Sequence, residues 1–203
     1  MMLLEGDFED ETFEDLEASG VTIERAIYER CRFVGCAFEE LAFSDSRFVD
    51  CSFERCNLVG VRFVDTLLQG VAFEGGRAMG LDFTQTRKLS LSLRFTDAKV
   101  DLSNFAGLPL RGTRFEDCSL RDVIFDDCDL RESVFKGSDL AGAVFRHVKL
   151  ARADLRKTRS ALIDVATCSL GETQIDVDTA LAALRDVGLH CASLEEMFGQ
   201  RDA

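Results

Sequence analysis

The sequence predicts an all-β fold, a square (quadrilateral) parallel β-helix solenoid of about eight coils with a short C-terminal α-helix. Three observations predict it. A large apolar residue recurs every five residues, the residue two places before it is small, and the residue two places after it is often glycine. A period of five fits neither the 3.6 residues of an α-helical turn nor the two-residue alternation of a flat strand. It fits a chain that turns a corner every five residues.

The large apolar residues, called central residues below, form two series. The first runs from Phe8 to Phe83 and the second from Phe95 to Ile175, and of the 17 phenylalanines only Phe198 lies outside them. A corner every five residues closes a square in about twenty, so each central side chain should point to the axis. It should stack on the residue twenty places on, at the strand spacing of about 4.8 Å. The predicted core includes Phe33, Phe53, Phe115, Phe125, Phe135 and Phe145.

The central residues alternate between phenylalanine and leucine from Phe105 to Leu150. Each coil in this stretch should therefore carry two phenylalanines on opposite faces and two leucines on the other faces.

The residues that flank the central positions agree with this fold. Seven of the eight cysteines stand at the small position, which should face inward because side chains alternate along a strand, and only Cys191 does not. Their spacing follows the repeat and not a zinc site, so packed free thiols are predicted and no metal. Glycine at the corner position favours the positive φ of a turn. The corner glycines are Gly20, Gly35, Gly60, Gly70, Gly75, Gly80, Gly107, Gly112, Gly137 and Gly142.

The repeat is interrupted between Phe83 and Phe95, where the spacing is twelve residues instead of ten. This excess predicts a bulge or short loop at about residues 84–94, and it puts Lys88 where a central residue would stand. A tolerated surface insertion and a functional loop are both compatible with the pattern.

The five-residue repeat ends near the C-terminus, which divides the chain into a β-helix of residues 1–177 and a helix with a tail over residues 178–203. Residues 176–178 are expected to cap a short helix over residues 179–187, which Gly188 ends. Its apolar stripe is Leu181, Leu184 and Val187. The helix either closes the open end of the solenoid or pairs with a second copy.

No catalytic or cofactor-binding motif stands apart from the repeat, and a filled solenoid has no enclosed pocket, so we expect neither an enzyme nor a cofactor. The sequence has no apolar run of membrane length and no recognisable signal peptide, which predicts a cytoplasmic protein without a membrane partner. The net charge of −13 argues against direct binding of nucleic acid and favours a basic partner.

The negative charge is concentrated in two stretches. Residues 1–20 hold eight acidic and no basic residues, and a second stretch includes Glu116, Asp117, Asp126 and Asp127. Residues 1–135 hold 27 acidic and 15 basic residues, a net of −12. Along a rod this is about one negative charge per 2.5–3 Å, the same order as the one per about 1.7 Å of duplex DNA. By contrast, a basic belt runs from residue 136 to residue 159.

Several repeats match the unit A-(D/N)-(L/F)-x-x, for example Cys128-Asp129-Leu130-Arg131-Glu132 and Ser138-Asp139-Leu140-Ala141-Gly142. In these residues the chain resembles the pentapeptide-repeat family over about residues 6–177. The resemblance implies a right-handed quadrilateral β-helix.

The length, the bulge near Arg87, the register shift and the C-terminal helix resemble the topoisomerase-protecting branch of that family. This branch comprises Qnr-type proteins and the albicidin- and microcin-resistance proteins. The resemblance implies a DNA-mimicking homodimeric rod that binds DNA gyrase or topoisomerase IV and relieves a poison such as a quinolone, albicidin or microcin. It also implies a dimer interface at Leu181, Leu184, Val187 and Leu189.

Two interpretations of the surface therefore remain. In the first, the rod mimics DNA and binds a topoisomerase, and the partner-binding residues are Arg87, Lys88, Glu116, Asp117, Asp126 and Asp127. In the second, the chain is a non-enzymatic scaffold or interaction module without a topoisomerase role. A continuous acidic face along the rod favours DNA mimicry, whereas scattered charge favours the scaffold.

Overall fold

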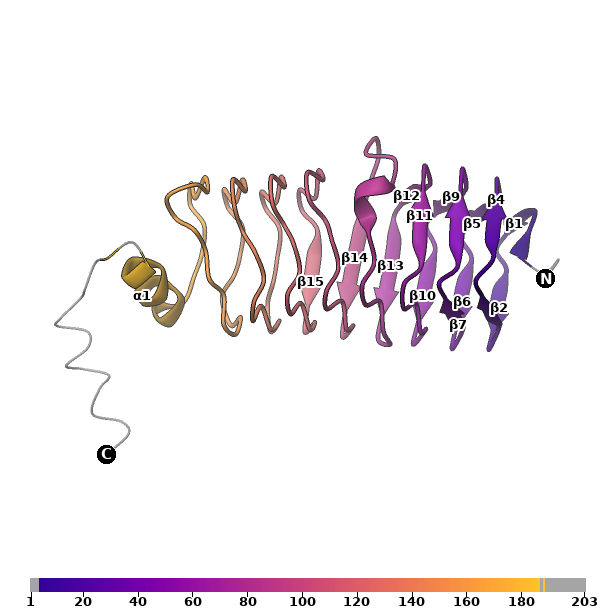
Figure 1. Cartoon of the computed structure of the whole chain (residues 1–203), viewed down its shortest axis with the longest axis horizontal. Coiled ribbons are helices and arrows are strands. Elements are labelled where there is room, and N and C mark those ends of the chain that lie inside the picture. The colour runs from indigo at the N-terminus through magenta and orange to yellow at the C-terminus, as the bar shows by residue number, and fades with distance from the viewer. Residues whose placement is uncertain (1–3, 187, 189–203) are drawn as a thin grey trace, which may run out of the picture.

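The backbone winds into a long rod with four sides, each built from short parallel strands (Figure 1). The computed structural model describes residues 4–186 and residue 188. Each side is named below after its first strand, so that the chain passes the β1, β2, β3 and β4 faces in turn. The all-β parallel solenoid predicted from the five-residue period is confirmed.

The strands are three or four residues long, because every fifth residue is a corner. The β1 face contains β1 (Asp7–Glu9), β5 (Ile27–Glu29), β9 (Arg47–Val49) and β12 (Leu67–Gln69). The β2 face contains β2 (Thr12–Glu14), β6 (Arg32–Val34), β10 (Ser52–Glu54), β13 (Val71–Glu74), β14 (Leu93–Thr96) and β15 (Arg114–Glu116). The β3 face contains β3 (Glu17–Ser19) and β7 (Ala37–Glu39). The β4 face contains β4 (Thr22–Glu24), β8 (Ala42–Ser44) and β11 (Arg62–Val64).

Strand pairing repeats every twenty residues, as in the pair of Phe53 with Phe73. The next pair on the same face joins Phe73 to Phe95, twenty-two residues on, so the two extra residues lie within that one coil. Regular strands stack six deep on the β2 face, which is fewer than the eight coils expected from the sequence. Beyond β15 the same ladder continues as isolated bridges that join Arg114, Val134 and Asp154.

The strands shorten to bridges because the corners tighten in the C-terminal half. There the residue three places after a central residue donates its N–H to the central carbonyl, as Cys128 does to Phe125 at 3.2 Å. This bond closes a β-turn and leaves fewer residues of each face in extended pairing.

Central side chains fill the axis of the rod. Rings on the β2 face stack at centroid distances of 4.8 to 5.2 Å, as between Phe33, Phe53 and Phe73. From Phe105 to Leu150 the phenylalanines lie on the β2 and β4 faces and leucines fill the other two, as the alternation predicts. The predicted core phenylalanines are all buried: Phe33, Phe53, Phe115, Phe125, Phe135 and Phe145.

The inward small residues are packed between coils, and the seven cysteines in the described chain are free thiols. Their sulfur atoms contact backbone carbonyls, for example Cys128 Sγ and the Phe105 oxygen at 2.9 Å. Burial raises the pKa of the Cys128 thiol to about 12, so this thiol stays protonated at neutral pH. Cys191 lies outside the described residues.

Corner residues adopt positive φ throughout the rod, and many of those that are not glycine are aspartate. The Asp117 side chain lies directly against the glycine corner of the next coil, since a Cβ on Gly137 would meet Asp117 Oδ1 at 2.0 Å. Asp122 and Gly142 repeat this arrangement at 2.1 Å. The two aspartate side chains therefore occupy the space that these glycines leave open, and a larger corner residue would require them to turn away.

The C-terminal helix α1 (Val177–Asp186) begins two residues earlier than predicted, and the rod ends against it. Thr179 and Ala183 are buried, whereas Leu181 and Leu184 are half-buried. The other two residues of the expected dimer interface, Val187 and Leu189, lie outside the described residues. Within the described chain no helix is both long enough and apolar enough to cross a membrane.

Candidate partner-binding loop and charged surface

One loop projects from the otherwise regular rod, at the corner between the β4 and β1 faces (Figure 1). It follows a short 3-10 helix, η2 (Phe83–Gln85), whose first turn is capped by the Asp82 carboxylate accepting from the Thr84 N–H at 3.0 Å. The loop is the place where the two excess residues of the sequence are accommodated.

Two cations fix the loop to the coils on either side. Arg87 forms an ion pair with Asp45 at 3.3 Å on the N-terminal side. Lys88 Nζ donates to the Gly107 carbonyl at 3.1 Å on the C-terminal side. Both Asp45 and Gly107 are corner residues of the same edge of the rod. The loop is thus held at its base, although its cations are exposed.

The five-residue period would put a central residue at Lys88, but the chain leaves the period here. The Lys88 side chain is exposed, and Leu91 packs half-buried against the core instead. Burying an ammonium group on the apolar axis would cost far more than shifting the register by a few residues. The chain therefore loops outward until an apolar side chain is available.

The loop carries an apolar tip. The Leu89 side chain is 85% exposed, the highest exposure among the large apolar residues of the described chain. Ser90 next to it has a φ of 64°, which turns the chain back toward the rod. Single exposed apolar residues are common on protein surfaces, so what distinguishes Leu89 is its place at the tip of a loop that is tethered at its base.

Acidic corner residues flank the loop along the same edge. Asp45 and Asp65 precede it and Asp127 follows it, and all three are exposed. Of the residues expected to bind a partner, the fold therefore brings together Arg87, Lys88 and Asp127. Sequence reasoning did not single out Asp45 and Asp65, although their spacing of twenty residues places them in one corner column.

The other expected partner-binding residues lie elsewhere. Glu116 is on the β2 face and Asp117 at its far corner, on the side of the rod away from the loop. The Arg114 guanidinium, which pairs with Glu116 at 2.7 Å, holds the pKa of that carboxyl below its usual range. Asp126 lies on the β4 face and pairs with Arg146. The six residues do not form one surface.

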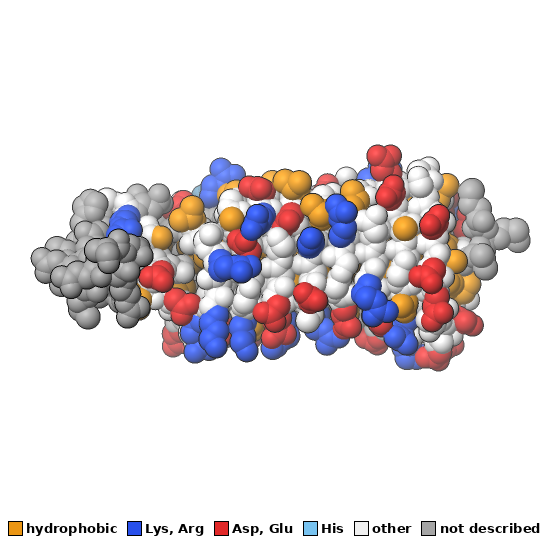
Figure 2. Space-filling view, turned by 90° about the horizontal axis from the view of Figure 1, so that it is seen from below, with side chains coloured by type: hydrophobic (Ala, Val, Ile, Leu, Met, Phe, Trp, Pro, Cys, Tyr) orange, Lys and Arg blue, Asp and Glu red, His pale blue; other side chains and the backbone are white. Residues whose placement is uncertain are grey.

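Arginine–carboxylate pairs interrupt the acidic charge on every face of the described rod. Examples from successive faces are Arg131 with Asp129, Arg94 with Glu74, Arg121 with Asp139 and Arg146 with Asp126. Figure 2 shows one long side of the rod, where acidic and basic side chains alternate along its length. The basic belt is interleaved in the same way, since Arg152 pairs with Glu132 and Arg156 with Asp154. The described surface therefore carries no continuous acidic face.

The surface offers little for chemistry. Among the described residues no group of three or more histidine, cysteine or acidic side chains could hold a metal ion. The hollows are shallow and lie on the outside, such as one of about 440 Å³ along the β2 face beside Arg114, Lys136 and Asp154. The described rod is thus a charged surface on a filled core.

The fold is similar to that of solved pentapeptide repeat structures. A trypsin-treated form of QnrB1, described as a plasmid-mediated fluoroquinolone resistance protein, is 21% identical with a TM-score of 0.54; the match covers 92% of this chain and 97% of that chain. HetL, a pentapeptide repeat protein involved in heterocyst differentiation regulation from the cyanobacterium Nostoc sp. strain PCC 7120, is 13% identical with a TM-score of 0.56. That match covers 82% of this chain and 85% of that chain. At these identities the likeness shows the fold alone.

No curated protein matches the sequence. The model of the pentapeptide repeat region matches residues 26–94 and again residues 88–159, and the two matches meet at the projecting loop. Together they span well over half of the 203 residues. With the five-residue period, the four-sided coil and the positive-φ corners, they show that this chain belongs to the pentapeptide repeat family.

Proposed function

We propose that this chain is a non-catalytic cytoplasmic rod that binds a bacterial type II topoisomerase, DNA gyrase or topoisomerase IV, and relieves its inhibition by a poison. The observation that carries the proposal is the tethered loop with the exposed Leu89 at its tip. A uniform solenoid offers similar surfaces along its whole length, whereas this loop gives one edge a distinct shape. The family resemblance of the loop and register shift points to topoisomerase as the partner.

The charge distribution limits how the contact is made. Mimicry of duplex DNA along a whole face needs uninterrupted negative charge, and ion pairs interrupt every described face. We therefore place the contact at the loop edge, where the exposed Asp65 and Asp127 flank Leu89 and where Asp45 is paired with Arg87 of the loop itself. Acidic corners around an apolar anchor fit a basic, DNA-binding surface of the enzyme.

The proposal predicts that the loop determines binding. Replacing Leu89 by aspartate should weaken binding to gyrase about tenfold or more, since a carboxylate in the proposed contact would lose its water without gaining a partner. The measurement is sedimentation or surface-plasmon binding of the purified rod to the gyrase heterotetramer. Leu162→Asp is the matched control, because Leu162 is also exposed (60%) but lies far along the rod from the loop, near the C-terminal helix. Equal affinity of the Leu89 and Leu162 variants would contradict the proposed contact.

We further propose that two rods pair through their C-terminal ends. Leu181 and Leu184 stay half-buried on α1, while Thr179 and Ala183 are buried. Leu184→Asp should convert a dimer to a monomer, because a carboxylate would enter an apolar contact without a partner. Light scattering measures this directly, with one chain weighing 22.6 kDa. The same mass for both proteins would rule out this interface.

A scaffold that binds some other protein is the second candidate, and the interleaved charges favour it. HetL shares the fold and is described as a regulator of heterocyst differentiation, so the architecture is compatible with other partners. The binding measurement above separates the two candidates, because a scaffold of this kind has no affinity for gyrase or topoisomerase IV.

A further inference from the structure

Among residues 4–186, the N-terminal end of the rod is an open sheet edge on its four sides. Within this part of the chain, strands β1, β2, β3 and β4 each pair with one neighbour only, in the C-terminal direction. Such edges present unpaired N–H and C=O groups, on which a further strand is able to dock. This end is independent of the loop edge.

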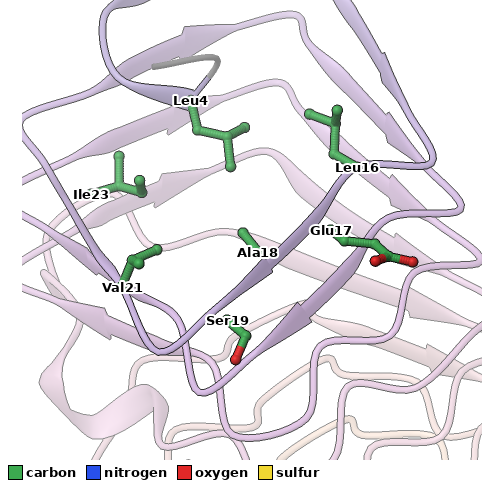
Figure 3. Close-up of a pocket in the computed structure, with 7 residues that line it drawn as sticks. All are labelled: Leu4, Leu16, Glu17, Ala18, Ser19, Val21 and Ile23. Atoms are coloured by element: carbon green, nitrogen blue, oxygen red, sulfur yellow. The ribbon is translucent and has the colours of Figure 1, made fainter. Parts of the chain in front are cut away.

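A hollow of about 260 Å³ lies beside two of these edge strands (Figure 3). Its lining is mainly apolar, with Glu17 and Ser19 from the edge strand at its rim. The hollow exists because Ala18 occupies a central position where the next coil has Phe38. The apolar lining residues are Leu4, Leu16, Ala18, Val21 and Ile23.

The lining of the hollow is partly exposed to solvent. Leu16, Ala18 and Val21 are half-buried, whereas the corresponding residues one coil further along, Cys36, Phe38 and Leu41, are buried. One more strand with an inward apolar side chain would bury them in the same way.

The rim of this end is strongly acidic. Eight acidic residues between positions 5 and 17 are exposed and no basic residue lies among them. Of these, only Glu9 and Asp10 have an ion-pair partner in the described chain, and for both it is Arg30. A second copy of the same end would bring like charges together, whereas a basic segment would meet complementary charge.

We propose that the edge of β3 binds an extended basic segment of a partner protein by strand addition, with one apolar side chain of that segment filling the hollow. Strand addition supplies affinity through main-chain hydrogen bonds and specificity through alternate side chains. The site is separate from the topoisomerase contact, so either assignment can fail without the other.

The existing coils give the pattern of main-chain bonds. The Ala37 N–H donates to the Leu16 carbonyl at 2.8 Å, and the Gly20 N–H donates to the Glu39 carbonyl at 3.0 Å. An incoming parallel strand that continues this pattern engages the Glu17 N–H and the Ser19 carbonyl. Its central side chain then stacks above Ala18, inside the hollow, and its two neighbours point outward toward the acidic rim.

The test is fluorescence anisotropy with a labelled synthetic peptide in which arginine and threonine surround one leucine. The same sequence with N-methylated backbone amides is the first control, because it keeps the charge but loses the main-chain donors. The peptide with glutamate in place of arginine is the second. We expect saturable binding of the first peptide and at least about tenfold weaker binding of both controls.

Variants of the rod locate the binding site. Ala18→Phe should fill the hollow and weaken peptide binding about tenfold or more, and Glu17→Lys should weaken it by charge reversal without filling it. Glu172→Lys makes the same charge change at the other end of the rod and should leave binding unchanged. Thermal unfolding checks that each variant is folded, and Glu17→Lys carries the test if Ala18→Phe is not.

Three results would overturn the proposal. They are binding of the N-methylated peptide as tight as that of the parent peptide, equal peptide binding by the Glu17 and Glu172 variants, and no binding of any peptide. A change in the mass of the rod itself on Glu17→Lys, seen by light scattering, would assign the edge to a second copy and would equally refute a basic partner.

Discussion

Replacing Phe125 by aspartate is expected to abolish cooperative folding of the coils around it. The ring is fully buried and stacks between Phe105 at 5.4 Å and Phe145 at 5.1 Å. It also meets Phe115 and Phe135 edge to face. Removing a buried phenylalanine side chain alone costs about 3–5 kcal/mol. The substitution also puts an unpaired carboxylate on the axis, and that adds a further penalty.

The neighbouring residue gives a matched control on the same face. Ile124 points outward and is 38% exposed, so Ile124→Asp should change the melting temperature little. Circular dichroism during thermal unfolding measures both variants against the parent. An unchanged melting curve for the Phe125 variant would show that the assignment of inward and outward positions is wrong.

Gly76→Ala is expected to be the most damaging of the glycine substitutions. Gly76 has a φ of 70°, and a Cβ there would meet the Cys56 carbonyl oxygen at 2.2 Å and the Cys56 nitrogen at 2.7 Å. Both contacts are with backbone atoms of the neighbouring coil, which a side-chain rotation does not relieve. The coils would have to move apart, and relief of such overpacking costs typically about 1–3 kcal/mol beyond the strain of positive φ.

Gly80 allows the cost of the backbone clash to be separated from the cost of positive φ. Its φ is 64°, close to that of Gly76, but a Cβ there would meet nothing within 4 Å. Gly80→Ala should therefore cost only the strain of a left-handed alanine, roughly 1–2 kcal/mol. Urea unfolding of both variants gives the difference in free energy of unfolding. Equal losses would mean that the close approach of the coils at Gly76 contributes nothing.

The core and the corners of this fold could be predicted from the sequence because both are local in the repeat. Phe53 and Phe73 share a face simply because they are twenty residues apart, and no long-range contact has to be guessed. The corner φ values follow for the same reason, since every corner residue stands two places after a central residue. The seven inward cysteines obeyed the same rule.

The path of the loop and the lengths of the strands depend on which side chain is buried and on how the turns close, and the five-residue repeat does not determine either. Leu91 takes the inward place instead of Lys88, because burying an ammonium group costs more than extending the loop by a few residues. The start of α1 at Val177 and the shortening of the strands beyond β15 depend on how turns close at the C-terminal end. The pattern predicted a helix that begins two residues late and about eight coils, whereas regular strands stack six deep.

The charged surface was the least predictable part. A sum over residues 1–135 gives a net of −12, but it does not show that Asp126 meets Arg146 or that Glu54 meets Arg32. These partners are twenty or twenty-two residues apart and meet only because coils stack. Exposed pairs of this kind add little stability. Their effect is to neutralise the faces, which leaves the loop edge and the N-terminal end as the distinctive surfaces.

The central claim is protection of a topoisomerase, and its most direct test is gyrase supercoiling with a quinolone present while the purified rod is added in increasing amounts. Supercoiling and drug-induced DNA cleavage are measured in the same reactions. We expect that supercoiling recovers, that cleavage falls, and that Leu89→Asp loses both effects while Leu162→Asp keeps them. Correctly folded rod with no effect on gyrase or on topoisomerase IV, with a quinolone or with another poison, would contradict the claim and leave the scaffold as the function.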